Sequence, residues 1–192
     1  SSSQPAAAAA PKLTLIYVVG GTRADARLGT VELYDPQAAS CKQLASMITP
    51  RGMHGCVALD GKLYAVGGDD AAGATLDTAE VYDPQTDGWQ PLAKMTTARI
   101  ALGLAAVRGK IYASGGSAES GGSAELRLES VEAYDPQLGA WALVASMSVR
   151  RSYHASVVLD GKIYAMGGLD GDDDFLDTVE VYDPQADSWQ RV

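Results

Sequence analysis

The sequence predicts an all-β fold in which one unit of four antiparallel strands is copied four times along the chain. The tetrapeptide Tyr-Asp-Pro-Gln begins at Tyr34, Tyr82, Tyr134 and Tyr182, in steps of 48, 52 and 48 residues. A Gly-Gly doublet keeps the same interval, at residues 20–21, 67–68, 115–116 and 167–168. Self-similarity near fifty residues indicates one supersecondary unit repeated several times. No helical periodicity competes with this pattern.

The first two strands of a unit are clearest in the second copy. Residues 54–59 form a short apolar run, Asp60-Gly61 follows, and residues 62–66 form another apolar run. An Asp-Gly pair between two such runs predicts a two-residue hairpin, because both central residues of that turn need a positive φ. Asp160-Gly161 repeats the signal, and Arg108-Gly109 keeps the glycine. The Gly-Gly doublet then ends the second strand of each unit.

The third and fourth strands complete a meander. Residues 78–82 read as the third strand, which Asp83-Pro84 ends because proline has no N–H to donate to a ladder. Trp89 begins a fourth strand that we expect to run to about Met95. One such sheet cannot bury both of its faces, and radial stacking of the copies solves this problem. We therefore expect the repeated Trp and Tyr rings to be buried between neighbouring sheets.

The repeated residues carry a family resemblance. Gly-Gly, then Leu-Asp-Thr-Val-Glu-Val-Tyr-Asp-Pro, a spaced Trp, and Met with Arg four residues later resemble the kelch repeat, in copies near 13–47, 48–95, 96–147 and 148–192. Residues 159–171 are most similar to the propellers of BTB-kelch proteins. The resemblance implies a kelch-type β-propeller of four four-stranded blades or part-blades, a segment of a larger, six-bladed ring. Two departures are Cys41 in place of the Trp, and Leu102 in place of the His of other copies.

Both ends of the repeat region are incomplete. The first copy begins at its second strand, and the last stops at residues 189–192, just inside its fourth strand. We expect the propeller to be completed by further blades or by another chain. Residues 1–12, rich in Ser, Ala and Pro, are expected to form a disordered linker and do not resemble a signal peptide.

Charge and composition narrow the function classes. A formal net charge of −9 argues against nucleic acid as a partner and favours a protein or peptide partner of basic or mixed charge. The longest apolar run has the length of a strand, so no membrane partner is expected. Two cysteines are not a disulfide framework, and we expect a reducing compartment such as the cytoplasm. Cys41 is either a buried thiol standing in for Trp or a redox-sensitive one.

The repeat arginines are candidate partner-binding residues. Arg51, Arg99 and Arg151 each follow the repeat Met by four residues, in the link from one blade to the next. Such links converge on one face of a propeller, where arginine can bind acidic side chains bidentately. A residue present in every copy can equally be structural, holding turn carbonyls. Arg150 occurs in one copy only, which favours a functional role for it.

Variable links after each Gly-Gly doublet should share that face: residues 22–30, 69–78, 117–130 and 169–178. Their sequences differ while the scaffold does not, as expected of recognition loops on a rigid frame. Residues 172–174 are three aspartates, for which Ca²⁺ binding and a solvated acidic tip are the alternatives; the run lacks the ligand spacing of a calcium loop. The candidate partner-binding residues in these links are Asp70, Glu125, Arg127, Asp172 and Asp173.

Catalytic signals are weak. His54 and His154 occupy the same register in two copies, which favours structural histidines over a metal-binding or catalytic pair. No glycine-rich phosphate loop opens a helix, and no cofactor or metal is expected. The sequence thus favours a non-enzymatic protein–protein interaction module, for which the resemblance suggests substrate capture for a cullin-based ubiquitin ligase. The alternatives are a scaffold subunit of a cytoskeletal or other large assembly, and a kelch-type oxidase or sugar epimerase.

Overall fold

The structure is a computed structural model that describes residues 15–120 and 123–192, without the side chains of residues 119–125. The all-β prediction is confirmed, since these residues form strands, turns and irregular segments and no helix. Each of the four copies forms its own antiparallel sheet, called here blades 1 to 4 in chain order, and one further hairpin stands apart. Residues 1–12, expected to be a linker, lie outside the described residues.

Blade 1 has three strands among the described residues, and each of the other blades has four, in the order of the chain. Blade 1 contains β1 (Ile16–Arg23), β2 (Ala26–Asp35) and β3 (Ser40–Leu44). Blade 2 contains β4 (Gly55–Leu59), β5 (Lys62–Val66), β6 (Ala79–Asp83) and β7 (Gly88–Pro91). Blade 3 contains β8 (Gly103–Val107), β9 (Lys110–Ser114), β12 (Val131–Asp135) and β13 (Ala140–Val144). Blade 4 contains β14 (Ala155–Leu159), β15 (Lys162–Met166), β16 (Val179–Asp183) and β17 (Ser188–Arg191).

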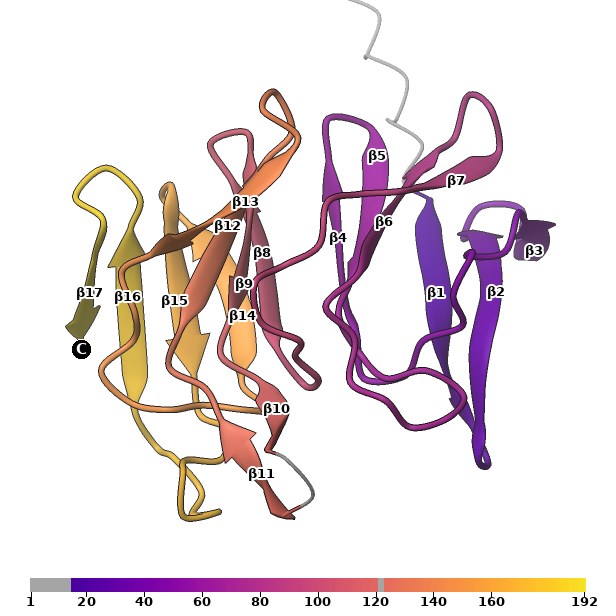
Figure 1. Ribbon diagram of the computed structural model, residues 1–192. Coiled ribbons are helices and arrows are strands. Elements are labelled where there is room, and N and C mark those ends of the chain that lie inside the picture. Colours follow the sequence, from indigo (N-terminus) through magenta and orange to yellow (C-terminus); the bar gives the residue numbers. More distant parts are fainter. Residues whose placement is uncertain (1–14, 121–122) are drawn as a thin grey trace, which may run out of the picture.

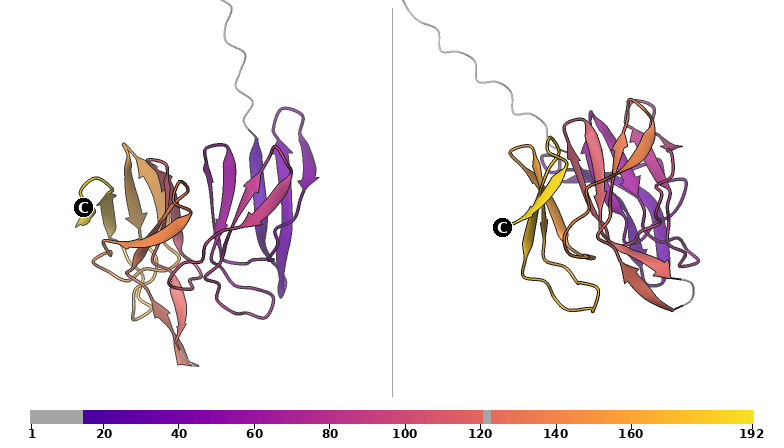
Figure 2. Two further views of the ribbon diagram at one scale, coloured as in Figure 1. Left: turned by 45° about the horizontal axis from the view of Figure 1, so that its top comes forward. Right: turned by 60° about the vertical axis from the view of Figure 1, so that its left-hand side comes forward.

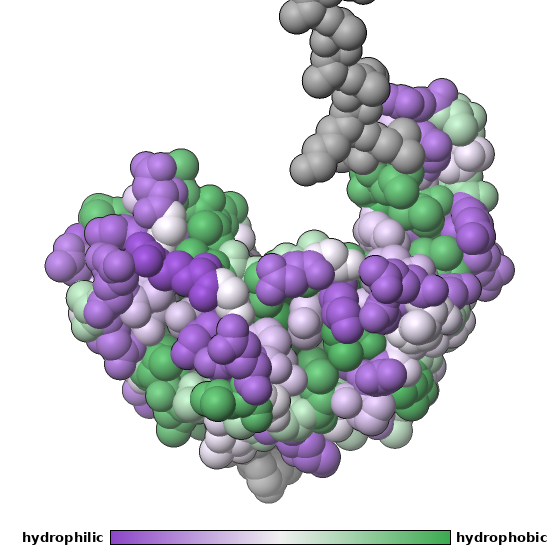
Figure 3. Space-filling view, turned by 90° about the horizontal axis from the view of Figure 1, so that it is seen from above, coloured by the Kyte–Doolittle hydropathy of each residue, from purple (hydrophilic) through white to green (hydrophobic). Residues whose placement is uncertain are grey.

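The blades stand side by side and curve into an arc. In Figure 1 they follow one another from blade 1 on the right to blade 4 on the left, and in Figure 3 the molecule seen from above is an open arc. The first strand of each complete blade is innermost, so that β8 packs between β4 and β14. This arrangement is the radial stacking that the repeat predicts.

The turn chemistry follows the sequence closely. Asp60 and Gly61 both have positive φ angles, 49° and 76°, as the Asp-Gly hairpin requires. Gly68 has a φ of 89°, and a Cβ atom built on it would lie 2.4 Å from the carbonyl oxygen of Gly52. The doublet therefore needs glycine both for its backbone angle and for the close approach of the chain. The fourth strand of blade 2 is shorter than expected, because it ends at Pro91 and does not extend to about Met95.

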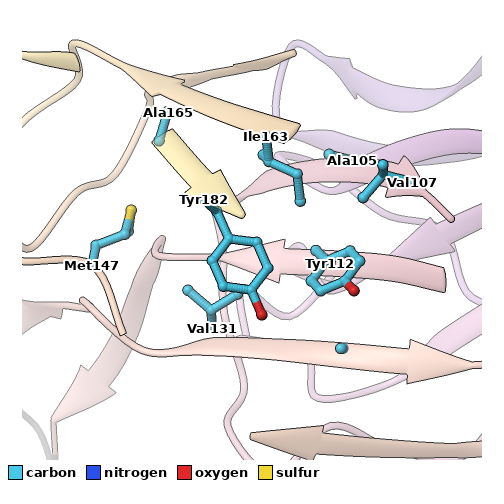
Figure 4. Close-up of a cluster of buried hydrophobic side chains, with 9 residues drawn as sticks. Ala105, Val107, Tyr112, Val131, Met147, Ile163, Ala165 and Tyr182 are labelled. Atoms are coloured by element: carbon cyan, nitrogen blue, oxygen red, sulfur yellow. The ribbon is translucent and has the colours of Figure 1, made fainter. Parts of the chain in front are cut away.

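Aromatic side chains fill the seams between blades. Figure 4 shows Tyr112 and Tyr182 in the cluster between blades 3 and 4. The centroids of these two rings are 5.5 Å apart. Trp89 is buried as expected, whereas Trp141 and Trp189 are only partly buried. All three indole N–H groups donate across a seam, to a carbonyl oxygen in the link that follows the last strand of the preceding blade. The acceptors are Ala45 for Trp89 (3.0 Å), Ala93 for Trp141 (3.0 Å) and Ala145 for Trp189 (2.9 Å).

Two expectations about single segments are corrected. Cys41 is not a buried substitute for tryptophan: it is exposed on β3, because among the described residues no sheet covers that side of blade 1. Cys56 is also a free, exposed thiol, on the innermost strand β4. The link 117–130, expected to be a loop, is long enough to fold back on itself as the hairpin β10 (Ser117–Ser120) and β11 (Ser123–Arg127).

Candidate functional site

Two kinds of connection lie at the same end of the blades, as the topology predicts. The links from one blade to the next pair with the links between second and third strands, through the bridges Gly52–Asp69, Ile100–Ser117 and Ser152–Leu169. We call this end the loop face; among the described residues it comprises 22–30, 48–54, 69–78, 96–102, 117–120, 123–130, 148–154 and 169–178. The opposite end, with the Asp-Gly and Asp-Pro turns, is the hairpin face. Figures 1 and 2 show β10 and β11 projecting from the loop face.

The repeat arginines do not reach the surface of this face. The Arg99 side chain has no exposed area, and it spans from the blade-to-blade link into its own blade. Its Nη1 donates to the carbonyl oxygens of Gly115 (2.9 Å) and Ser130 (3.0 Å), and its Nη2 lies 2.8 Å from Oε1 of Glu132. Glu132 also accepts hydrogen bonds from the backbone N–H groups of Thr96 and Thr97.

The same cluster recurs in blades 2 and 4. Arg51 pairs with Glu80 at 2.7 Å and Arg151 with Glu180 at 3.1 Å, and both arginines are fully buried. Of the two roles that the sequence left open for these arginines, the structural role accounts for every observed contact. A buried guanidinium group presents no surface to a partner, so we leave Arg51, Arg99 and Arg151 out of the proposed binding face.

Burial and hydrogen bonding act in opposite directions on these ionisable groups. Desolvation lowers the pKa of Arg99, although the hydrogen bond to Glu132 opposes the shift. At Glu180, burial disfavours the charged carboxylate, but hydrogen bonds from Ser148 and Arg151 outweigh it and hold the pKa below its ordinary value. The arginine–glutamate pairs are therefore buried, hydrogen-bonded ion pairs inside blades 2, 3 and 4. They are not saturated with hydrogen bonds, since Nε of Arg51 and Nε of Arg99 are buried without a partner among the described residues.

Arg150, in contrast, is available to a partner. Its side chain is about half exposed and forms an ion pair of 3.0 Å with the equally exposed Glu129. Exposed pairs of this kind are weak, typically about 0–1 kcal/mol, so a partner carboxylate can replace Glu129 at little cost. The pair lies beside a shallow hollow lined by residues 126–130 of the third link.

Arg127 and Asp173 are brought together from neighbouring blades. Arg127, at the end of β11, donates to Asp173 in blade 4 and lies 2.6 Å from Oγ of Ser117. Its guanidinium carbon is 5.9 Å from the ring centroid of Tyr153. Only 8% of Arg127 is exposed, whereas Asp173 remains largely accessible. Arg27 and Asp69 make the corresponding link between blades 1 and 2.

The other predicted residues have different environments. Asp70 is half-buried, and its Oδ1 accepts the backbone N–H groups of Ala72 (2.9 Å) and Ala74 (3.0 Å), which is a structural role in the turn. Asp172 is exposed at the tip of the fourth link. Glu125 lies on β11, but its side chain is outside the described part of the chain.

The second and fourth links have the same backbone and different side chains. Asp170 repeats the role of Asp70, accepting the N–H groups of Asp172 and Asp174. Where blade 2 has Ala72-Gly73-Ala74-Thr75, blade 4 has Asp172-Asp173-Asp174-Phe175. Forming the turn therefore does not require the three aspartates or the phenylalanine. Among the described residues, no three His, Cys, Asp or Glu side chains are grouped as a metal site would need.

Sequence reasoning missed three exposed apolar side chains of this face. Met53 and Tyr153 are 41% and 53% exposed, and the hydroxyl of Tyr153 lies 3.5 Å from Sδ of Met53. Phe175 is 91% exposed and lines a hollow of about 390 Å³ together with Tyr153, Leu169 and Leu176. Comparing copies residue by residue could have found them, since blade 2 has Met53 and Thr75 where blade 4 has Tyr153 and Phe175.

Backbone hydrogen bonds join equivalent positions of successive blades beneath these side chains. The N–H of Ala101 donates to the carbonyl oxygen of Met53, and the N–H of Tyr153 donates to that of Ala101, both at 2.9 Å. All three residues have positive φ angles, 47°, 50° and 55°. The loop face therefore has a rim in which the backbone has the same conformation at each of these three positions, whereas the side chains differ.

The histidines lie immediately before the innermost strands β4 and β14. His154 is buried, with Nε2 at 3.1 Å from Oγ of Ser114. Desolvation, with a smaller effect from the nearby arginine of the same link, lowers the pKa of both His54 and His154 to about 4. At neutral pH both rings are uncharged, as expected of structural histidines.

Comparison with known proteins agrees with this architecture. The kelch motif matches residues 7–48, 50–96, 98–148 and 150–192, nearly the whole chain. The chain belongs to the kelch-repeat family. It is 38% identical over 162 residues to Kelch-like protein 28 of Homo sapiens, an alignment that covers 84% of this chain and 20% of that protein. It is 33% identical over 164 residues to Kelch-like protein 33 of Homo sapiens, covering 84% of this chain and 21% of the relative.

A shorter alignment, about the length of one repeat, has a higher sequence identity. Over 40 residues, 21% of this chain and 7% of the relative, the kelch chain is 48% identical to Kelch-like protein 15 of Danio rerio. The chain thus spans about a fifth or less of the length of these curated relatives. Over its described residues the structure contains no helix long and apolar enough to cross a membrane.

Proposed function

We propose that this kelch chain is a protein–protein interaction module that binds its partner through the loop face. The observation that carries the proposal is that, on this face, residues that recur among copies hold the scaffold while residues that differ among copies are exposed. Residues that recur among copies are occupied in holding the scaffold, such as Arg99 with its equivalents Arg51 and Arg151, and Asp70 with its blade 4 equivalent Asp170. Residues that differ among copies, including Arg150, Tyr153 and Phe175, are exposed. Variation on a rigid frame lets each blade contribute a different contact.

The partner segment should carry both apolar and charged side chains. Phe175 and Tyr153 offer apolar surface, Arg150 offers a positive charge, and Asp172 and Asp173 offer negative charge. With a chain net charge of −9, a basic or mixed-charge segment is favoured. Because these groups are solvent-exposed, we expect the affinity to fall as salt concentration rises.

Two sets of variants test the proposal. On the loop face, Arg150→Ala is combined with Phe175→Thr, which installs the side chain of blade 2. On the hairpin face, Gln85→Ala and Gln185→Ala alter exposed turn residues of two blades. We expect loss of partner capture with the loop-face variant, at an unchanged melting temperature, and normal capture with the hairpin-face variant. The reverse pattern would place the working surface on the hairpin face and overturn the proposal.

A finer proposal is that the captured partner is the substrate of a cullin-based ubiquitin ligase. The similarity to Kelch-like proteins supports it, and the role requires BTB and BACK domains in the same polypeptide. The test is co-precipitation of a cullin with the product of the complete reading frame, expressed in cells. A reading frame without a BTB domain, or a product that retains no cullin, would favour a scaffold subunit instead.

Completion of the propeller by further blades, as in a six-bladed ring, is also a proposal. At the interior seams the N–H of Gly68 donates to Arg99 O (2.9 Å), and the N–H of Arg99 donates to Leu76 O (3.1 Å). Gly168 and Leu176 are the blade 4 equivalents of Gly68 and Leu76, and they line the hollow beside Phe175. Val157 and Leu159 of the same blade are 46% and 56% exposed, which supports a covering element there.

A further inference from the structure

The outermost strand of blade 3 has an unpaired edge in the interior of the arc of blades. Among the described residues, β13 pairs with β12 on one side and with no strand on the other. Such an edge directs alternate N–H and C=O groups outward, where another strand can pair with them. The outer strands β3, β7 and β17 of the other blades have edges of the same kind. The side chains on each edge therefore decide whether it favours or opposes pairing.

The other three outer strands carry residues that oppose pairing. Charged side chains and proline on an edge strand are the usual means by which proteins prevent strands of other chains from adding there. Strand β13 has alanine and leucine, Ala142 and Leu143, at two successive positions in its middle. At the same two positions the other blades have Lys42-Gln43 in β3, Gln90-Pro91 in β7 and Gln190-Arg191 in β17. Blade 3 thus lacks the protection that each of the other blades has.

Two leucines that occur only in blade 3 are exposed beside this edge. Leu143 on β13 is 62% exposed, and Leu138 in the turn before β13 is 77% exposed. The equivalents of Leu138 in the other copies are Ala38, Thr86 and Ala186. Since the other blades form the same turn and the same strand without leucine, the scaffold does not require either side chain. An apolar edge strand with exposed leucines is a site of strand addition.

The distribution of charge favours a second copy of this chain as the occupant. Residues 136–149 contain no charged side chain, and the sequence has no longer uncharged run. With a net charge of −9, two copies repel each other over most of their surface, but pairing at β13 brings no charges into contact. A basic or mixed-charge partner would find no counter-charge on this strand. Antiparallel pairing of β13 with itself is self-complementary, as a two-fold interface requires.

We propose that two copies of this chain associate by antiparallel pairing of their β13 strands, which joins the two blade 3 sheets into one. The contact is small, so the dimer should dissociate on dilution. Strand β13 runs from the hairpin face toward the loop face. Antiparallel pairing therefore directs the two loop faces toward opposite ends of the dimer and leaves both uncovered. The pairing does not depend on partner binding at the loop face.

The first measurements follow self-association of the full chain. By sedimentation equilibrium at concentrations from about 1 to about 300 μM, we expect the mass to rise from 20.0 kDa toward twice that value. The amides of residues 140–144 should exchange with solvent more slowly at the highest concentration, because outward N–H groups become paired. A mass of 20.0 kDa throughout, or a dimer with unchanged exchange at residues 140–144, would overturn the proposal.

Two matched lysine variants locate the interface. Ala142→Lys installs the residue of blade 1 on β13, and Gln190→Lys adds the same charge to an exposed position of β17. In a two-fold dimer each substitution occurs twice, so the two lysines of Ala142→Lys lie close to the axis and repel each other. We expect Ala142→Lys to raise the dimer dissociation constant by about tenfold or more, and Gln190→Lys to change it by less than about twofold.

Two further variants make the result decisive. Leu143→Arg, which installs the residue of blade 4, should also abolish the dimer. Ala142→Lys and Leu143→Arg should keep the melting temperature of the dilute wild type, because both side chains are exposed in the monomer. Val18→Lys places a charge on the edge strand β1 and should leave the dimer intact. A dimer lost with Val18→Lys or Gln190→Lys but retained with Ala142→Lys would place self-association at another edge and overturn the proposal.

Discussion

Single residues of the repeat divide into those that hold the blades and those that face outward, and Arg99 illustrates the first kind. It is identical in role to Arg51 and Arg151, and all three are fully buried against a glutamate. Removing the arginine alone would leave a buried carboxylate without its counter-charge. That situation is more costly than the loss of an exposed pair.

We expect Arg99→Ala to lower the free energy of unfolding by about 3–5 kcal/mol, because Glu132 and two carbonyl oxygens lose their donor. Arg150→Ala, which breaks only the exposed pair with Glu129, should change it by less than about 1 kcal/mol. Urea denaturation of the two variants and the wild type provides the comparison. Equal midpoints for both variants would show that the buried cluster is not a stabilising element.

His154 makes the stability depend on pH. Its folded-state pKa is about 4, against an ordinary value of 6.5, so between these pH values the unfolded chain binds a proton that the folded chain does not. Stability should therefore fall as the pH decreases from about 6.5 to about 4, by up to roughly 3 kcal/mol from this residue. His154→Gln should show a shallower fall when urea midpoints are measured across this range. An unchanged slope would mean that the ring is accessible to protonation in the folded state.

At the scale of the element, the seams between blades are not equivalent. Across the seam of blades 1 and 2, Oδ1 of Asp87 accepts the hydroxyl of Tyr82 (2.7 Å) and the N–H of Ala45 (2.9 Å). Asp187 makes the same two bonds, to Tyr182 and Ala145, across the seam of blades 3 and 4. The equivalent residue at the seam of blades 2 and 3 is Gly139.

Gly139→Asp should therefore strengthen the middle seam. Gly139 has a φ of 65°, Asp87 and Asp187 adopt 47° at the same position, and a Cβ atom on Gly139 would meet no atom within 4 Å. The new carboxylate can accept from Tyr134 and Ala93, and we expect a gain of about 1 kcal/mol. The reverse substitution, Asp187→Gly, should cost a similar amount. Thermal denaturation of both variants tests this, and a destabilised Gly139→Asp would show that the middle seam has a different geometry.

At the scale of the whole molecule, blade 1 has the fewest of the side-chain contacts that stabilise the other blades and the seams between them. It has Cys41 in place of the tryptophan, Ala39 in place of the seam aspartate, and Glu32 without a cation among the described residues. We expect the amides of β1–β3 to exchange with solvent faster than those of β8, β9 and β12, in native-state hydrogen exchange. Finding β1–β3 to be the best protected strands would contradict the assignment of these residues as stabilising anchors.

The repeat predicted the architecture because each marker residue has a local reason to recur. Asp60-Gly61 turns the chain wherever it occurs, and Gly68 is needed at every close approach. The loop face was harder to predict. Whether a repeated arginine points into the blade or out of it depends on a glutamate about thirty residues further along the chain, which spacing alone does not reveal. The pairing of β10 with β11, the contact of Arg127 with Asp173 of blade 4, and the exposure of Phe175 likewise carry no signal in the spacing of the repeat.

The backbone rim formed by Met53, Ala101 and Tyr153 has a consequence for the evolution of this surface. Its hydrogen bonds use only main-chain atoms, and the three side chains range from a methyl group to a phenol ring. Mutation at these positions can therefore change what the surface presents while the connection between blades is inherited intact. New binding preferences can arise here one residue at a time, without a compensating change in the core.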